Sequence, residues 1–163
     1  MDKDLRQLSI TTGQYLLSRG ATLTSAESCT GGWIAKVITD ISGSSAWFGQ
    51  GFVTYSNQAK MSQLGVSAAT LEAHGAVSEA TVREMASGAL HTARADFAVS
   101  VSGIAGPDGG SEDKPVGTVW FGFASADGRV LAECRHFSGD RDSVRSQAVA
   151  FALRTLCSEF LEK

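Results

Sequence analysis

The chain has 163 residues, of which 43% are hydrophobic and 19% charged, a composition typical of a globular domain large enough to fold around one core. A formal net charge of −3 argues against a broad basic face, so we expect no nucleic-acid partner. No apolar run approaches the ~18 residues of a membrane span, so we expect no membrane partner. The cysteines form no zinc pattern, and we expect reduced thiols at Cys29, Cys134 and Cys157. We therefore expect one cytoplasmic domain over residues 1–163.

Hydrophobic periodicity, β-branched runs and glycines divide the chain into alternating helices and strands. In chain order, the first half is predicted as a helix over 3–19, a strand over 21–26, a helix over 31–40, a turn over 43–48, a strand over 49–56, and short helices over 57–65 and 67–74. The second half is predicted as a helix over 78–94, a strand over 96–103, a loop over 104–115, strands over 116–125 and 129–137, and a helix over 140–161.

Ser78 is the predicted N-cap of the helix over 78–94, and Asp127-Gly128 predicts a hairpin between the last two strands. This order indicates a three-layer α/β/α domain with a mixed, mainly parallel sheet and a late β-hairpin. Ligands of such sheets bind at loops that leave the carboxyl ends of the strands. The loops over 26–32, 56–60 and 103–114 are predicted at that position.

The segment SAESCTGGW, residues 25–33, joins a predicted strand to a predicted helix through two glycines. Backbone amides at the start of a helix can hold a phosphate or the oxyanion formed when a carbonyl is attacked. The segment is neither a P-loop nor GxGxxG, which argues against the standard nucleotide-binding motifs, and it is not GxSxG. The alternative is that Ser28 or Thr30 only caps the helix.

A serine hydroxyl needs a base before it becomes a good nucleophile. The three histidines suggest no Ser-His-Asp arrangement, but TYSNQAK places Tyr55 at a strand end and Lys60 early in the next helix. If the strands over 21–26 and 49–56 are neighbours, Lys60 can meet Ser28, and a desolvated lysine can accept a proton. The alternative is that Lys60 is a solvated surface lysine.

The glycine-rich loop over 101–118 and the start of the last helix suggest a binding surface. The acidic residues of that loop match no calcium motif, so we expect them to be solvated and expect no metal. Arg141 and Arg145 are four residues apart near a positive helix terminus, which favours an anionic partner such as a phosphate. Salt bridges to Asp140 or Asp142 are the alternative.

Together the motifs TSAESCTGGWIAKVITDISGSSAWFGQGFVTYSNQAK, HGAVSE, SVSGIAGPDGG, KPVGTVWFGFA and FSGDRDSVRSQA resemble the CinA C-terminal-domain family, and within it the stand-alone nicotinamide-nucleotide amidohydrolases. The resemblance covers residues 5–160. It implies hydrolysis of the carboxamide of nicotinamide mononucleotide to nicotinate mononucleotide and ammonia, in the recycling of NAD. It also implies a homodimer, and amide hydrolysis of this kind requires no cofactor. Larger relatives carry a further N-terminal domain, whose activity is not transferred.

The resemblance and the chemistry of the residues together give one hypothesis for the site. Ser28 attacks the amide, Lys60 acts as base with help from Tyr55, and amides near Thr30 to Gly32 hold the oxyanion. The expected substrate-binding residues are Glu27, Thr30, Gly31, Gly32, Ser44, Gly103, Ala105, Gly106, Arg141 and Arg145. The alternatives are a non-catalytic nucleotide-binding module and a hydrolase of another small amide.

Overall fold

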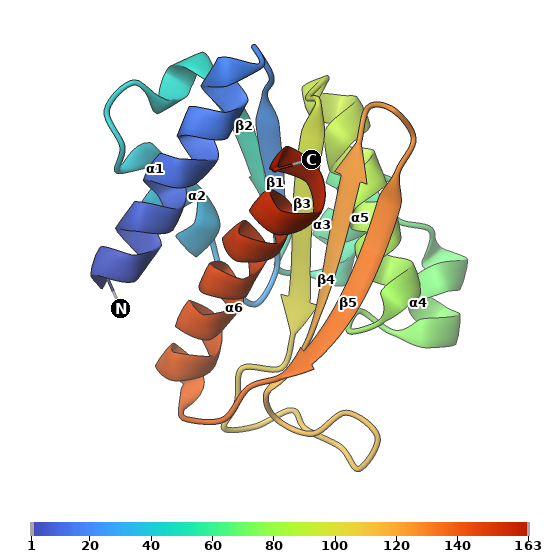
Figure 1. The fold of residues 1–163 in the computed structure, drawn as a ribbon. Helices are drawn as coiled ribbons and strands as arrows, with labels where there is room; N and C mark the ends of the chain where they lie inside the picture. The colour runs from blue at the N-terminus through green and yellow to red at the C-terminus, as the bar shows by residue number, and fades with distance from the viewer. Residues whose placement is uncertain (1, 163) are drawn as a thin grey trace.

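A computed structural model of the chain describes residues 2–162 and contains one five-stranded sheet with the order β2-β1-β3-β4-β5 (Figure 1). The strands are β1 (Leu23–Glu27), β2 (Phe48–Val53), β3 (Phe97–Gly103), β4 (Thr118–Ser125) and β5 (Val130–His136). β1 is parallel to both β2 and β3, and β4 is antiparallel to both β3 and β5. All strands except β4 therefore point the same way, which confirms the mixed, mainly parallel sheet and the late hairpin.

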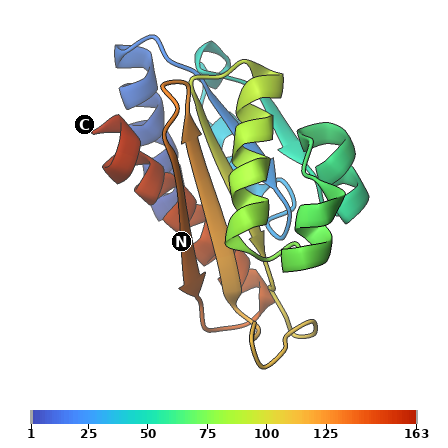
Figure 2. The same ribbon diagram turned by 90° about the vertical axis from the view of Figure 1, so that its right-hand side faces the viewer.

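Helices cover both faces of the sheet (Figures 1 and 2), as the predicted three-layer arrangement requires. One face carries α1 (Asp2–Ser18), α2 (Trp33–Thr39) and α6 (Arg141–Leu156), the last continued by a π-helical turn, η2 (Cys157–Leu161). The other face carries α3 (Asn57–Leu64), α4 (Ala68–His74) and α5 (Glu79–Ala93). A short 3₁₀ helix, η1 (Ser44–Ala46), precedes β2.

Alternation along the strands divides the core between these two faces, because successive side chains of a strand point to opposite sides. On β3, Val99 and Val101 belong to the larger cluster, which includes residues of α1, α2 and α6. Ala98 belongs to the second cluster with α5 residues such as Val82 and Met85. No helix within residues 2–162 is long and apolar enough to cross a membrane.

Helix boundaries follow the predicted capping residues, with small shifts that have local causes. The Ser78 side chain accepts from the Thr81 amide, which confirms Ser78 as the N-cap of α5. α2 begins at Trp33 rather than at residue 31, because Gly31 and Gly32 have φ values of +61° and +104°. These left-handed conformations favour glycine and delay the start of the helix.

The common direction of β1, β2, β3 and β5 places their carboxyl ends at one edge of the sheet. The segments that follow them, residues 28–32, 54–56, 104–117 and 137–140, therefore gather at this edge. The three predicted ligand loops lie there, and so does the start of α6.

Candidate active site

A pocket of about 210 Å³ opens at the carboxyl edge of the sheet. Four separate parts of the chain supply the side chains that matter for its chemistry: Ser28 after β1, Tyr55 and Lys60 around the start of α3, Ser102 at the end of β3, and Arg141 at the start of α6. Residues far apart in the sequence thus form one pocket because the topology brings their strand ends together.

Ser28 and Lys60 are in direct contact in this pocket. Lys60 Nζ lies 2.9 Å from Ser28 Oγ, 2.9 Å from the Thr54 carbonyl oxygen and 3.5 Å from the Tyr55 carbonyl oxygen. Ser28 is 8% exposed and Lys60 only 1% exposed. The structure therefore brings together the nucleophile and the base that the sequence suggested, and Lys60 is not the solvated surface lysine of the alternative interpretation.

Local structure directs Lys60 toward the strand end. Ser56 caps α3 by accepting from the Ala59 amide at 3.0 Å, which places Lys60 within the first turns of the helix. Helical side chains lean toward the N-terminus, so the amine of Lys60 reaches back to Thr54 and Ser28. Burial lowers the pKa of Lys60 from its ordinary value, against a smaller opposing contribution from Cys29. Burial thus favours the neutral amine that a general base requires.

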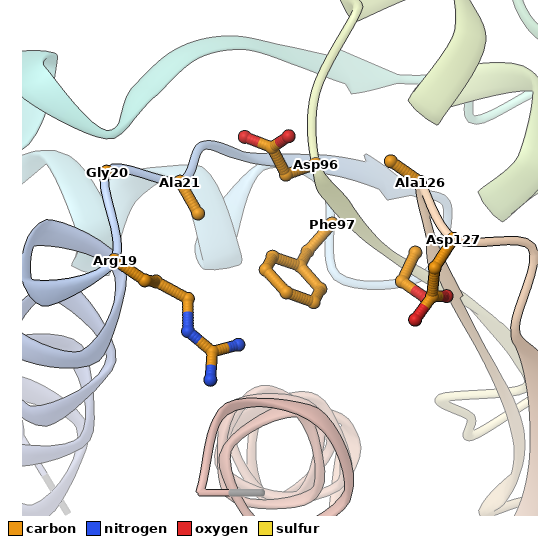
Figure 3. Close-up of a pocket in the computed structure, with 8 residues that line it drawn as sticks. Arg19, Gly20, Ala21, Asp96, Phe97, Ala126 and Asp127 are labelled. Carbon is orange, nitrogen blue, oxygen red and sulfur yellow. The ribbon is translucent and has the colours of Figure 1, made fainter.

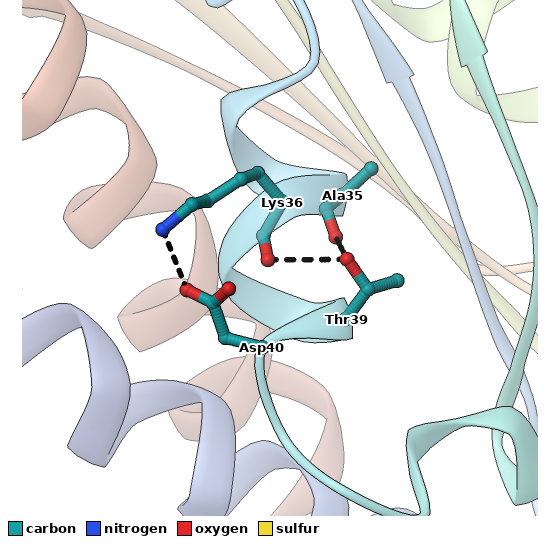
Figure 4. A network of polar contacts seen from close by, with 4 residues as sticks. All are labelled: Ala35, Lys36, Thr39 and Asp40. Carbon is teal, nitrogen blue, oxygen red and sulfur yellow. Dashed lines mark hydrogen bonds and ion pairs between the residues drawn. The ribbon is translucent and has the colours of Figure 1, made fainter.

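Lys36 shows the contrasting behaviour of an exposed lysine. Figure 4 shows its amine paired with Asp40 one turn further along α2, at 2.8 Å, while Thr39 donates to the Ala35 carbonyl. Hydrogen bonding to Asp40 raises the pKa of Lys36, so that this lysine stays charged. The pKa values of Lys60 and Lys36 shift in opposite directions because Lys60 is buried without a carboxylate beside it, whereas Lys36 is exposed and paired with one.

Cys29 directly follows Ser28, the predicted nucleophile, and also lines the pocket, but its thiol is less suited to nucleophilic attack. The side chain is buried, and burial raises the pKa of Cys29 to about 12. Only the thiolate is an effective nucleophile, so burial of the thiol disfavours Cys29 as the nucleophile at neutral pH.

Glu27, expected among the substrate-binding residues, lies outside the pocket lining. Its carboxylate is fully buried and accepts from the Thr30 hydroxyl at 2.6 Å and from the Ile34 and Ala35 amides at 2.8 and 3.0 Å. These contacts engage Glu27 with the start of α2.

Thr30, Gly31 and Gly32 also lie outside this pocket and border a separate one with Trp33 and Arg145. The Gly31 amide donates to the Ser28 carbonyl at 3.0 Å, so it is already engaged within the loop. The sequence predicted an oxyanion site at the amides of these three residues. The Gly31 amide does not contribute to such a site, because it is hydrogen-bonded within the turn that precedes α2.

The two arginines of the last helix have different surroundings. Arg141 lines the pocket, and its guanidinium donates to the Gly106 carbonyl at 2.8 Å and to the Tyr55 hydroxyl at 3.2 Å. Arg145 lies over the Trp33 ring and donates to the carbonyls of Cys29 and Thr30. Of the two, only Arg141 is placed to meet a ligand in the pocket.

The remaining predicted residues are divided between the pocket and other parts of the molecule. Gly103 and Ala105 line the pocket, and Gly106 contributes its carbonyl to Arg141. Ser44 does not line the pocket, because it lies in η1, ahead of β2, at the opposite edge of the sheet. The hydroxyl of Tyr55 reaches Arg141, and its backbone carbonyl rather than its hydroxyl faces Lys60.

Sequence reasoning missed four pocket residues: Asn57, Ala76, Val77 and Ser102. Asn57 and Ser102 stand within the motifs TYSNQAK and SVSGIAG, beside residues that were chosen. Their position next to strand ends was the available signal. Ala76 and Val77 line the pocket with apolar side chains and carry no reactive or polar group by which the sequence could mark them.

A further pocket of about 240 Å³ lies at the opposite edge of the sheet (Figure 3). Its polar groups are engaged within the fold: Asp96 accepts from the Thr22 amide, and the Ser125 hydroxyl donates to Asp127. Arg19 lies over the Phe97 ring, 5.7 Å from its centre. Within residues 2–162, no group of three or more His, Cys, Asp or Glu side chains is arranged to hold a metal.

Comparisons with known proteins identify the relatives of this chain. The profile of the family described as "CinA C-terminal domain" matches residues 5–160. The chain is 66% identical over 161 residues to "Nicotinamide-nucleotide amidohydrolase PncC" of Escherichia coli K12, covering 99% of this chain and 98% of that protein. It is 64% identical to the protein of the same name from Enterobacter agglomerans, with the same coverage of both chains. Among solved structures, "competence/damage inducible protein CihA" of Agrobacterium tumefaciens superposes with a TM-score of 0.94 at 44% identity, covering 98% of this chain and 96% of that one.

Proposed function

The chain belongs to the CinA C-terminal domain family, and we propose that it hydrolyses the carboxamide of nicotinamide mononucleotide to nicotinate mononucleotide and ammonia, in the recycling of NAD. The observation that carries the proposal is the 2.9 Å contact between Lys60 Nζ and Ser28 Oγ in a pocket that also holds a guanidinium. Amide hydrolysis requires a nucleophile, a base that can return its proton, and a means of orienting the substrate.

In the first half of the reaction, neutral Lys60 takes the proton of Ser28 as Oγ attacks the carboxamide carbon. The tetrahedral intermediate collapses with breakage of the C–N bond, and the ammonium of Lys60 passes its proton to the leaving nitrogen, which departs as ammonia. The product of this half is an ester of Ser28 with the nicotinate nucleotide.

In the second half, Lys60 takes a proton from water, and the oxygen of that water attacks the ester carbon. The bond to Ser28 Oγ breaks, and Lys60 returns the proton to Oγ, which restores the enzyme and releases the carboxylic acid. We assign the N–H of Cys29 as the donor to the oxyanion, because Cys29 directly follows Ser28 and lines the same pocket.

Arg141 binds the phosphate of the substrate in this scheme. Its guanidinium is pre-oriented by the Gly106 carbonyl and the Tyr55 hydroxyl and still has N–H groups for an anion. Tyr55 then orients Arg141 and the substrate rather than relaying a proton. The loop through Gly103 and Ala105 lies against the nucleoside, where its backbone permits close approach.

We further propose that the protein acts in the cytoplasm as a homodimer, with neither nucleic acid nor a membrane as partner. Its three free thiols suit a reducing compartment, and its net charge of −3 disfavours polyanions. Sedimentation equilibrium of the purified protein tests the dimer: a single species with the mass of one chain would contradict it.

Ammonia release from nicotinamide mononucleotide tests the proposed function directly. We expect the purified protein to release ammonia, Ser28→Ala to lose activity by about 10⁴-fold or more, and Cys29→Ala to retain most of it. Free nicotinamide, glutamine and NAD are expected to react far more slowly. No ammonia from the wild type would reject the function, and loss of activity in Cys29→Ala but not in Ser28→Ala would reject the nucleophile.

A further inference from the structure

One buried carboxylate has no part in the reaction scheme, although it directly precedes the nucleophile. Glu27 is the last residue of β1 and is 0% exposed, and no ion pair involving it occurs among the described residues 2–162. Burial of a carboxylate is costly unless several donors compensate it. We therefore expect the carboxylate to have a role at this position that an apolar residue cannot fill.

The donors that meet Glu27 all belong to the segment that holds Ser28. Oε1 accepts from the Thr30 hydroxyl at 2.6 Å and from the Ile34 amide at 2.8 Å, and Oε2 accepts from the Ala35 amide at 3.0 Å. The carboxylate thus closes the chain from residue 27 to residue 35 into a compact turn, with the nucleophile at its start.

Arg145 holds the same turn from its outer side. Its Nε donates to the Cys29 carbonyl at 3.0 Å and Nη2 donates to the Thr30 carbonyl at 3.2 Å. Thr30 is therefore fixed through its hydroxyl by Glu27 and through its carbonyl by Arg145. Because its side chain and its carbonyl are both hydrogen-bonded, Thr30 restrains the backbone of the loop that carries Ser28.

The backbone of Glu27 connects this turn to the base. The Glu27 carbonyl accepts from the Thr54 amide at 2.8 Å, and the Thr54 carbonyl in turn accepts from Lys60 Nζ at 2.9 Å. Glu27 therefore has contacts on both sides of the site. Its side chain binds the loop that carries Ser28, and its carbonyl binds Thr54, which in turn binds Lys60.

We propose that Glu27 is a positioning residue that, together with Arg145, fixes the turn carrying Ser28 at hydrogen-bond distance from Lys60. This inference rests on the proposed function and extends it, because it assigns Glu27 and Arg145 to the support of the nucleophile and not to contact with the substrate. A misplacement of about 1 Å at a reacting atom can cost about 100-fold in rate.

The test is the kinetics of Glu27→Gln with nicotinamide mononucleotide. The glutamine fills the same space, but its NH₂ group faces the Ala35 amide, so that two donors oppose each other. We expect kcat to fall about 100-fold while KM changes by less than about threefold, since the substrate contacts are intact. A residue that binds substrate would instead raise KM.

Glu84→Gln is the matched control. Glu84 accepts from the Ser67 amide and the Thr70 hydroxyl at the start of α4, so it holds a seven-residue helix as Glu27 does, but away from the pocket. We expect kcat and KM of this variant to stay within about twofold of the wild type, because its contacts do not reach Ser28 or Lys60. An equal loss of kcat in Glu84→Gln would overturn the proposal, since helix capping in general would then explain the effect.

Thr30→Val supplies a second variant that removes only one hydrogen bond to Glu27. It is expected to lower kcat about 10-fold at unchanged KM, and it decides the question if Glu27→Gln does not fold. Wild-type kcat in whichever variant is folded would reject the proposal. The rate at which a fluorophosphonate modifies Ser28 is measured in parallel and should fall with kcat in both variants. This rate reports on Ser28 even if the wild type releases no ammonia. Failure of the proposed function is therefore distinguished from failure of the positioning role.

Discussion

Lys60 is the residue on which the proposed chemistry depends most, because its environment changes what an amine can do. In water a lysine is protonated at neutral pH and cannot accept a proton. Here the amine is 1% exposed and faces a serine hydroxyl and a carbonyl oxygen, with no carboxylate in hydrogen-bond contact among the residues described. Burial without an anionic partner is the arrangement that turns a lysine into a base.

The pH dependence of turnover should report this base. Burial lowers the pKa of Lys60 from 10.5, and in the proposed mechanism the neutral amine is the active form. We therefore expect kcat/KM for nicotinamide mononucleotide to rise with pH to a plateau, with the midpoint of the rising limb below 10.5. A profile that falls as pH rises, or a rising limb with its midpoint at or above 10.5, would contradict Lys60 as the base.

The same burial should cost stability, so Lys60→Met is expected to inactivate the protein and stabilise it. Because the folded pKa is lowered, the unfolded chain binds more protons between that pKa and 10.5. The penalty is full below the folded pKa and is relieved as pH rises. We expect a gain in the free energy of unfolding, and a higher Tm, at pH 7, and we expect this gain to shrink toward pH 10.

Denaturant unfolding at several pH values measures this gain. Lys36→Met is the control: Lys36 is exposed and paired with Asp40 on the surface, so its replacement should change stability by less than about 0.5 kcal/mol. A Lys60→Met variant that is less stable than the wild type at pH 7 would contradict the argument.

Arg141 should determine affinity for the phosphate and not the rate of chemistry. Removing a charge-assisted hydrogen bond in Arg141→Met is expected to raise KM about 10–100-fold with little change in kcat. For nicotinamide riboside, which lacks the phosphate, we expect the wild type and Arg141→Met to have similar KM values. Arg154→Met, an exposed arginine on the same helix, is the control and should behave as the wild type.

Among the secondary-structure elements, α3 matters because it carries Lys60, the proposed base, and a glycine of α5 permits the close approach of these two helices. A Cβ placed on Gly88 of α5 would lie 1.8 Å from the Leu64 carbonyl oxygen at the end of α3. Backbone cannot yield as a flexible side chain can. The close approach of these two helices therefore depends on the absence of a side chain at residue 88.

Gly88→Ala should test this dependence. We expect a loss of about 1–3 kcal/mol from overpacking, although alanine favours helix, together with reduced kcat because α3 must shift with Lys60. Thermal unfolding and steady-state kinetics measure the two effects. Gly49→Ala on β2, where an added Cβ meets no atom within 4 Å, is the control; equal behaviour of the two variants would contradict the packing argument.

At the scale of the whole molecule, the pocket exists only in the folded chain, since its walls come from the ends of β1, β2 and β3 and from the start of α6. A ligand that binds all of these parts should therefore stabilise the entire fold against unfolding. The inactive Ser28→Ala variant permits this measurement with the substrate itself.

Nicotinamide mononucleotide at 100 times its Kd should stabilise Ser28→Ala by about 2.7 kcal/mol, which corresponds to roughly 5–11 °C in Tm. Differential scanning calorimetry at increasing ligand concentration measures the shift. The double variant Ser28→Ala with Arg141→Met should lose most of it at the same concentration, whereas an unchanged shift would mean that the phosphate is bound elsewhere.

Much of the fold could be predicted from the sequence, because the signals are local. The N-cap at Ser78, the hairpin at Asp127-Gly128 and the order of elements depend on near neighbours in the chain and are confirmed. The meeting of Ser28 with Lys60 was predicted only on the condition that two strands are adjacent. The pairing of β1 with β2 supplies that condition.

Local patterns in the chain were enough to predict the elements and the side chains that the proposed chemistry uses, because motifs, capping residues and periodicity are properties of short segments. The division of these side chains between the pocket and other parts of the molecule could be seen only in the folded chain. Arg141 and Arg145 share a helix face, yet Gly106 and Tyr55 hold one in the pocket while Cys29 and Thr30 hold the other outside it. The physical reason is that the direction of a polar side chain is set by its hydrogen-bond partners, and these come from parts of the chain that only the sheet brings together.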